Sequence, residues 1–446
     1  MIEARRGRAV LFMAVLLLVL PMTAANQDEK VVVIGLDGAS SDFMQRCIDE
    51  ADLQNIEELS QRGSFNTMNS TLPPLTPSGM SSYLTGSDPG DHGVYGFEKR
   101  NMLDYETSTV NSLNLGETLP EAVDGKSVMI NVPMTYPARE INGVMVSGFP
   151  GSTSGEYVHP PTLKKDLEER NYTVTTAGNF GGGEELERDV FEAFKTRRQV
   201  SLDYMERFEW DYFNVMFTGD ARLMHFSEPS CQGAIKDYYR GLDEFVGKVD
   251  DRTDENTTII VMSNHGFTEL DKKMYMYTFL KENDYLKPKQ PEYTIHRFQD
   301  FAGNILSKLG LSSGGEVSGR ASFSDQYMDE VDWDETKAYT GGFYNGQIFI
   351  NLEGREPNGV VPKEDYEEVR GNIIEDLKQL EDPETGEKVV ENVYTKEELY
   401  DGEKMDELPD IIIETPGYNH IARFGFGDTF LKDPVERSAP VKEGFM

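Results

Sequence analysis

A lone acid ends an apolar run near the start of the chain. Residues 31–38 read VVVIGLDG, so that Asp37 follows six residues, five of them apolar, and precedes a glycine. A short apolar run bounded by a turn signal predicts a buried strand, and ligands in open α/β sheets collect at the carboxyl ends of strands. Asp37 is therefore a candidate ligand. The structural alternative is that Asp37 caps a helix expected over residues 40–50.

Two later apolar runs also end in side chains that suit chemistry. Residues 212–217 are followed by Asp220 and His225, and residues 258–262 are followed by Asn264 and His265. Aspartate and histidine without clustered cysteine suit a divalent metal ion of the zinc, manganese or iron type. Because these residues follow predicted strands, we expect them to meet Asp37 at one edge of a sheet.

Thr76 is the candidate nucleophile. It begins a helix expected over residues 76–86 (TPSGMSSYLTG), where the following proline suits the first turn. A hydroxyl at a helix N-terminus lies beside backbone N–H groups that bind phosphate oxygens, and contact with a metal would activate it for attack. Two metal ions a few ångströms apart stabilise both oxygens of a phosphoryl transfer. The chemistry indicated is therefore phosphoryl transfer.

The elements that must position these residues alternate between strand and helix. This order predicts an α/β fold with a mostly parallel sheet flanked by helices on both faces. The composition shifts at about residues 285–330, which indicates an inserted cap segment.

The N-terminal segment resembles a targeting signal. Three arginines precede the apolar residues 9–20, and small residues follow a proline at position 21. This layout predicts a signal peptide over residues 1–25, or an uncleaved N-terminal anchor. We therefore expect a secreted or extracytoplasmic protein that meets a membrane only through an uncleaved N-terminus.

The chain of 446 residues carries a formal net charge of -36, with 79 acidic and 43 basic residues. Such an excess of acid argues against nucleic-acid binding and is typical of the solvated surface of proteins adapted to high salt. A chain of this length needs no disulfide, so Cys47 and Cys231 are interpreted as small buried hydrophobic residues. One disulfide between them stays open as an alternative.

Several motifs in order resemble the alkaline phosphatase superfamily, in particular its type I phosphodiesterase/nucleotide pyrophosphatase group and the microbial branch of predicted phosphohydrolases or phosphomutases. The resemblance implies one alkaline-phosphatase-like catalytic domain over residues 30–446. The motifs that carry it are LDG at 36–38, the Thr76 to Gly86 spacing, NVPMTYPAR at 131–139, SNHG at 263–266, VDWDETKAY at 331–339 and GQIFINLEGREPNG at 346–359.

The resemblance implies a role for each candidate residue. Thr76 matches the nucleophile, which becomes transiently phosphorylated and also contacts a metal, and His92 matches a structural turn residue. Two divalent ions are implied, with zinc favoured and manganese, iron or magnesium as alternatives. The metal ligands implied or considered are Asp37, Thr76, Asp220, His225, Asn264 and His265.

The chain departs from the family pattern at three points. Asn264 stands where the family has aspartate, and Ala221 stands four residues before His225, where the family has another aspartate. Asp220 is the neighbouring acid. The family's last histidine ligand has no match near the C-terminus, so either the sequence is truncated there or this ligand is absent.

These observations predict metal-dependent hydrolysis of a phosphoric ester through a phospho-threonine intermediate. The expected substrate is a phosphorylated small molecule, a nucleotide or a lipid. The alternative is a weakened or inactive relative that binds a phosphorylated ligand or partner. A phosphomutase or sulfatase on the same fold also stays open, although a sulfatase normally has cysteine or serine in place of Thr76.

Overall fold

The computed structural model describes residues 29–175, 183–270, 272–289, 331–341, 347–415, 420–423, 429–431 and 438–446. Its largest element is an eight-stranded sheet in the order β2-β19-β9-β1-β8-β5-β6-β7. The neighbouring strands β9, β1, β8, β5 and β6 run parallel, and the other three pair antiparallel at the two edges. In sequence order the strands are β1 (Lys30–Leu36), β2 (Thr67–Asn69), β5 (Ser127–Val132), β6 (Gly143–Ser147), β7 (Val158–His159), β8 (Tyr212–Phe217), β9 (Thr257–Ser263) and β19 (Glu443–Phe445).

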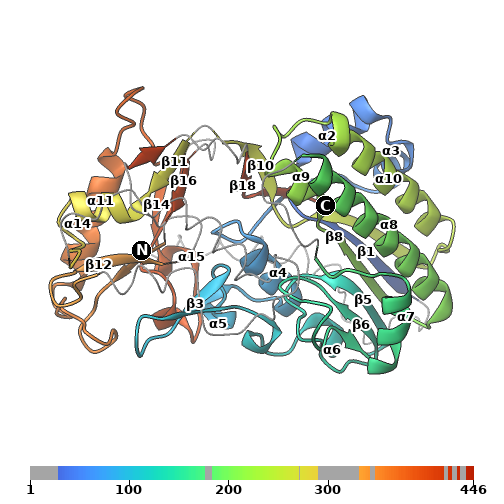
Figure 1. Ribbon diagram of the computed structural model, residues 1–446, viewed down its shortest axis with the longest axis horizontal. Helices are drawn as coiled ribbons and strands as arrows, with labels where there is room; N and C mark the ends of the chain where they lie inside the picture. The colour runs from blue at the N-terminus through green and yellow to red at the C-terminus, as the bar shows by residue number, and fades with distance from the viewer. Residues whose placement is uncertain are drawn as a thin grey trace, which may run out of the picture.

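Helices cover both faces of this sheet (Figure 1). Successive strand residues point to opposite faces, so Val32 and Ile34 pack in one hydrophobic core and Val33 packs in another. The first core includes α2 (Ser41–Ala51), α3 (Gln54–Arg62), α7 (Lys164–Glu169), α8 (Glu184–Arg207), α9 (Gly219–Met224) and α10 (Gly233–Asp250). The second includes α4 (Thr76–Thr85), with α5 (Pro89–His92) and α6 (Leu119–Ala122) beside it.

The predicted α/β architecture is therefore confirmed. Its physical basis is visible in β1, where every residue from Val32 to Leu36 is buried. A strand covered on both faces must be apolar at consecutive positions, and this is the pattern that the sequence carries.

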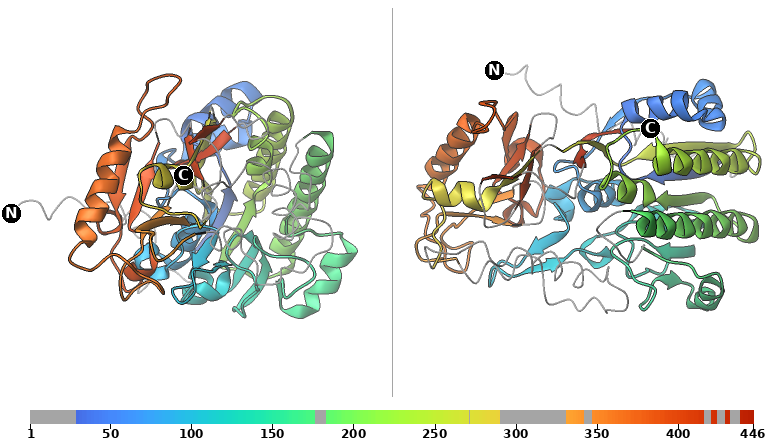
Figure 2. Two further views of the ribbon diagram at one scale, coloured as in Figure 1. Left: turned by 60° about the vertical axis from the view of Figure 1, so that its left-hand side comes forward. Right: turned by 45° about the horizontal axis from the view of Figure 1, so that its top comes forward.

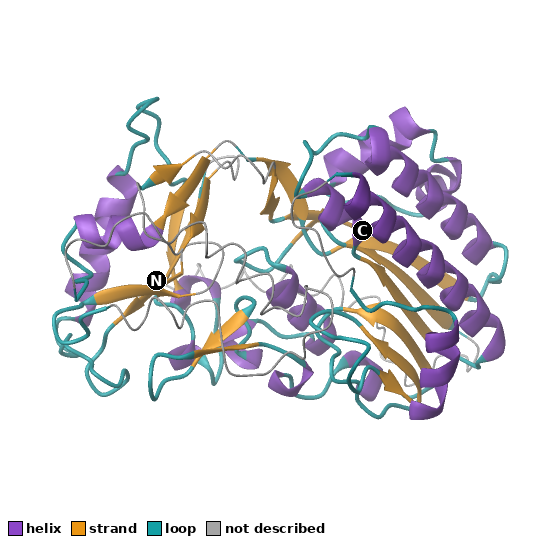
Figure 3. Ribbon diagram, in the orientation of Figure 1, coloured by secondary structure: helices purple, strands orange, loops and turns teal. Residues whose placement is uncertain are grey.

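An antiparallel sheet in the order β12-β13-β15-β14 lies beside the large sheet (Figures 2 and 3). A separate hydrophobic core is built around it. Its elements are α11 (Met276–Glu282), β12 (Ala338–Gly341), β13 (Gln347–Ile350), α14 (Tyr366–Gln379), β14 (Asn392–Thr395), α15 (Lys396–Leu399) and β15 (Ile411–Glu414). Of the cap segment expected at about 285–330, residues 290–330 lie outside the described residues.

A hairpin formed by β3 (Glu98–Arg100) and β4 (Thr107–Thr109) follows α5 and packs against this separate core. Arg100 donates a hydrogen bond to the Tyr339 hydroxyl at 3.0 Å and pairs with Glu356. The Tyr105 ring stacks on Trp333 with centroids 3.6 Å apart. The segment that follows α5 is thus held by buried polar and aromatic contacts.

Two small sheets complete the described fold. One has the order β16-β11-β17, and the other pairs β10 with β18 in antiparallel fashion. The chain therefore returns at its C-terminal end to β10, and β19 then pairs with β9 and β2. These strands are β10 (Gly266–Glu269), β11 (Lys272–Tyr275), β16 (His420–Arg423), β17 (Phe430–Leu431) and β18 (Ser438–Val441).

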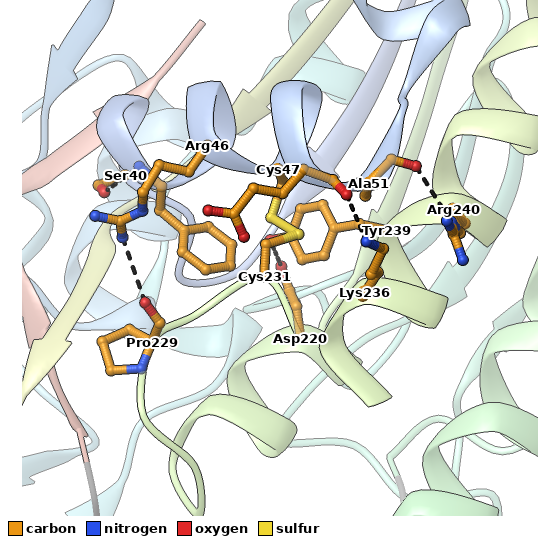
Figure 4. The surroundings of a disulfide bond; sticks show 12 residues. Ser40, Arg46, Cys47, Ala51, Asp220, Pro229, Cys231, Lys236, Tyr239 and Arg240 are labelled. Atoms are coloured by element: carbon orange, nitrogen blue, oxygen red, sulfur yellow. Dashed lines mark hydrogen bonds between the residues drawn. A yellow bond between two sulfur atoms is a disulfide. The ribbon is translucent and has the colours of Figure 1, made fainter. Parts of the chain in front are cut away.

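The interpretation of the two cysteines as unpaired hydrophobic residues is wrong. Cys47 on α2 and Cys231 before α10 form a disulfide, with Cα atoms 5.3 Å apart (Figure 4). Both are buried, but 184 residues separate them, so only the packing of α2 against the loop after α9 brings them together. Arg46 reinforces this contact by donating to the Pro229 carbonyl at 3.3 Å.

The predicted signal peptide or anchor over residues 1–25 lies outside the described residues. Within the described part of the chain, no helix combines the length and the apolar character needed to cross a membrane.

Candidate active site

Strand register brings the candidate segments to one edge of the large sheet. Leu36 of β1 lies opposite Phe217 of β8 on one side and opposite Ser263 of β9 on the other. The three strands therefore end at the same level, and Asp37 follows the central one. The Ser263 hydroxyl accepts hydrogen bonds from the backbone N–H groups of Gly38 and Ala39 at 3.2 and 2.9 Å, which fixes the turn after Asp37.

Asp37 does not cap the following helix. The N-cap of α2 is Ser40, whose side chain accepts a hydrogen bond from the Phe43 N–H at 3.2 Å. The Asp37 carboxylate is directed instead toward Thr76 and His265, so the structural alternative for this acid is excluded.

Thr76, Asp37 and His265 converge at this edge. The Thr76 hydroxyl donates to Asp37 Oδ1 at 2.9 Å, and its Oγ1 lies 3.2 Å from His265 Nε2. His265 Nε2 also lies 3.2 Å from Asp37 Oδ1. Thr76 is the first residue of α4, as predicted, and Pro77 occupies the first turn. Thr76 is half-buried, whereas Asp37 and His265 are buried.

The two ring nitrogens of His265 face different partners. His265 Nδ1 lies 3.0 Å from the Gly266 carbonyl oxygen, which only accepts hydrogen bonds. Nδ1 therefore carries a proton, and Nε2 faces Thr76 and Asp37. Metal-bound histidines typically have this arrangement, with the second nitrogen donating to a carbonyl. The side chains of Asp37, Thr76 and His265 therefore fit a divalent cation.

The electrostatic environment keeps Asp37 ionised. Burial raises the pKa of Asp37, but the hydrogen bond and positive charge of His265, with hydrogen bonds from Asn264 and Thr76, outweigh burial. The net result is a pKa of Asp37 below its ordinary value. The cluster thus contains the carboxylate of Asp37 together with the side chains of Thr76, Asn264 and His265.

Asp220 lies close to this cluster but is held differently. Its Oδ2 accepts from the Asp37 backbone N–H at 3.3 Å and from the Tyr239 hydroxyl at 3.2 Å (Figure 4). Its Oδ1 accepts from the Ala221 N–H at 3.0 Å. Burial and the charge of Asp37 raise the pKa of Asp220 well above its ordinary value. Asp220 thus positions the backbone of Asp37.

His225 lies against an aromatic ring. It follows the last residue of α9, and its ring centroid is 4.8 Å from that of Phe267. Phe267 also contacts His265, with centroids 5.6 Å apart. Among the described residues, no third His, Cys, Asp or Glu side chain joins Asp37 and His265 in a group that could hold a metal.

The structure thus brings together four of the six predicted site residues: Asp37, Thr76, Asn264 and His265. Asp220 is adjacent through the backbone of Asp37, and His225 is adjacent through Phe267. Sequence reasoning missed Tyr239 and Phe267 because each occupies a position where an aromatic residue is ordinary core packing. Ser263 was part of the SNHG motif but had no assigned role.

His92 lies outside the site, as predicted, and so does Arg139. The ring of His92 is hydrogen-bonded to Ser82 at 3.0 Å. Arg139 pairs with Glu121 at 2.9 Å and donates to backbone carbonyls, so its guanidinium group has a structural role.

Comparison with known proteins concerns the chain as a whole. The sequence profile described as "Type I phosphodiesterase / nucleotide pyrophosphatase" matches residues 31–424. Comparison with curated proteins gives no significant match.

Among solved structures, the chain resembles phosphonoacetate hydrolase from Sinorhizobium meliloti 1021 in complex with phosphonoacetate. The TM-score is 0.58 at 15% identity, over 93% of this chain and 90% of that chain. It also resembles wild-type alkaline phosphatase PafA, with a TM-score of 0.52 at 13% identity, over 94% and 91% of the two chains. At these identities the similarity concerns the fold, and it confirms the predicted alkaline-phosphatase-like architecture.

Proposed function

The chain belongs to the type I phosphodiesterase/nucleotide pyrophosphatase family of phosphoric-ester hydrolases, and we propose that its Thr76 is the nucleophile that attacks phosphorus. One observation carries this proposal. The Thr76 hydroxyl lies within hydrogen-bonding distance of Asp37 Oδ1 and of His265 Nε2, at 2.9 and 3.2 Å, at the half-buried start of α4.

A divalent cation would be held by Asp37, Thr76, Asn264 and His265. When bound, it would lower the pKa of the hydroxyl and stabilise negative charge on phosphoryl oxygens. This donor set, mostly oxygen with one imidazole, is compatible with zinc, manganese or magnesium.

The residues of the chain support a two-step reaction. Thr76 Oγ1 forms a bond to phosphorus while the ester P–O bond breaks; the hydroxyl proton leaves along the hydrogen bond to Asp37, and the departing alkoxide takes a proton from solvent. The N-terminal end of α4 carries no acidic side chain in its first turn, so its positive dipole favours the phosphoryl oxygens. Water then hydrolyses the phospho-threonine and restores the hydroxyl.

Replacement of Thr76 tests this mechanism. With bis-p-nitrophenyl phosphate as substrate, Thr76→Ala is expected to lower kcat by at least about 10³-fold, because the attacking atom is removed. Thr76→Ser keeps an oxygen nucleophile and is the matched control, which should retain measurable turnover. Acid-quenched protein should carry a phosphate on Thr76 by peptide mass spectrometry. Near-wild-type turnover by Thr76→Ala would disprove the assignment.

The weakened or inactive relative is the second candidate function. Ala221 and Asn264, each in place of a family aspartate, favour it because carboxylates help to hold cations. Asn264→Asp distinguishes the two candidates. Turnover by the natural chain supports the hydrolase, whereas turnover that appears only in Asn264→Asp supports the weakened relative.

Export from the cytoplasm is also proposed. It is supported by the signal-like segment over residues 1–25 and by the Cys47–Cys231 disulfide, since such bonds persist in oxidising compartments. Cell fractionation followed by thiol labelling provides the test. Recovery of the protein in the cytoplasm with two free thiols would contradict export.

A further inference from the structure

The Phe267 ring occupies the space next to both site histidines. Its centroid lies 4.8 Å from that of His225 and 5.6 Å from that of His265. A Cβ atom on Gly38 would lie 2.4 Å from the same ring, so the ring also packs directly on the turn after Asp37. The region where His225 approaches the cluster is therefore filled by an apolar side chain that offers no lone pair to a cation.

The carboxylate that precedes His225 in the sequence is already bonded within the protein. Asp220 accepts hydrogen bonds from the backbone N–H groups of Asp37 and Ala221 and from the Tyr239 hydroxyl. It is only 1% exposed. Three of its roughly four lone-pair sites are thus used within the protein. Ala221, the alternative position for this ligand, has no donor atom.

Strand β18, near the C-terminus, lies beside Phe267 without supplying a metal ligand from its described residues. β18 pairs with β10 in a register that sets Pro440 opposite Phe267 and Val441 opposite Gly266. The Ser438 hydroxyl donates to the Met224 carbonyl at 2.5 Å, next to His225. Within the described part of the chain, this edge of the site is thus closed by backbone pairing and small apolar residues.

Charge balance also argues against a second cation at this site. Two divalent ions would bring four positive charges to a cluster in which Asp37 is the carboxylate that contacts the other donors. One ion leaves a much smaller uncompensated charge in this buried place.

We propose that this chain holds a single divalent cation on Asp37, Thr76, Asn264 and His265, and that Phe267 takes the place of the second ion implied by the family resemblance. The proposal deepens the proposed function and rests on it for the identity of the site. Asp220 and His225 then serve as supports of the site, through the Asp37 backbone and the Phe267 ring.

Metal stoichiometry tests the proposal independently of turnover. The full chain, stripped with a chelator and dialysed against Mn²⁺ or Zn²⁺, is analysed by inductively coupled plasma mass spectrometry and by calorimetric titration. One equivalent per chain is expected. His265→Gln should lose this equivalent, whereas the matched variant His225→Gln should keep it. Asn264→Asp should bind the same single equivalent about tenfold more tightly, because a carboxylate replaces an amide.

The outcomes separate this inference from the proposed function. Two equivalents in the natural chain, one of them lost in His225→Gln, would overturn the single-cation site and leave the hydrolase intact. No bound metal would overturn the site itself, even if a phosphodiester is turned over. One bound equivalent without turnover would support the single-cation site and contradict the proposed hydrolase. The stoichiometry of the natural chain decides the question even if a variant fails to fold.

Discussion

At the scale of single residues, His92 shows how burial selects a protonation state. Its Nδ1 accepts a hydrogen bond from the Val94 N–H at 3.0 Å, and its Nε2 lies 3.0 Å from the Ser82 hydroxyl. A protonated ring would place a second N–H against the Val94 N–H. Burial, together with the charge of Lys404, lowers the pKa of His92 to about 4.

This shift predicts an acid-sensitive contribution to stability. The unfolded chain protonates His92 near pH 6.5 and the folded chain only near pH 4, so the contribution is complete above pH 6.5 and is lost as the pH falls toward 4. Between pH 7 and 5 the expected loss is about 2 kcal/mol. Urea titrations at the two pH values measure it. His92→Gln should show a smaller pH dependence, and an equal dependence would contradict the assignment.

At the scale of elements, the turn between β1 and α2 requires a glycine. Gly38 has a φ of 112°, a conformation that residues with a side chain rarely adopt, and the Phe267 ring fills the space where a Cβ would lie. The turn directs the Asp37 carboxylate to Thr76 and His265. The backbone conformation of Gly38 and the packing of the Phe267 ring against it therefore both affect the position of the Asp37 carboxylate.

Two glycine substitutions with opposite expected effects test this point. Gly38→Ala should lower the free energy of unfolding by about 1–3 kcal/mol, because it combines backbone strain with a clash. Gly371→Ala, within α14, meets no atom within 4 Å and should raise it by about 0.5–1 kcal/mol. Thermal and urea denaturation measure both changes. An unchanged free energy of unfolding in Gly38→Ala would show that the turn relaxes easily.

At the scale of the whole molecule, the acidic surface governs the response to salt. A formal net charge of -36 on 446 residues makes the compact state repel itself at low ionic strength. The Debye length falls from about 10 Å at 0.1 M salt to about 3 Å at 1 M, so added salt screens most of this repulsion.

The urea midpoint of unfolding should therefore rise when KCl is increased from 0.1 to 1 M. The slope of the transition should stay constant, because the surface exposed on unfolding is unchanged. Sucrose at the same osmolality is the control for effects unrelated to charge. A midpoint that is unchanged or lower in KCl would show that repulsion does not limit stability.

Local patterns in the sequence determined the α/β architecture of the protein. The apolar residues of β1, ended by Asp37 and Gly38, predicted a buried strand with a candidate ligand at its carboxyl end. The Thr-Pro start of α4 predicted a helix that begins at Thr76. These predictions hold because strand burial and helix initiation depend on neighbouring residues, whose pattern is present in the sequence.

Only the tertiary structure decided which distant groups meet. It paired Cys47 with Cys231, directed Asp220 to the Asp37 backbone and Tyr239, and packed Phe267 between the site residues and the turn at Gly38. Three of these contacts, Cys47–Cys231, Asp37–Asp220 and Gly38–Phe267, join residues more than 180 positions apart, and each depends on how whole strands and helices pack. Local periodicity carries no information on such packing, so the sequence supplied candidate residues for the site, whereas the fold determined what each of them contacts.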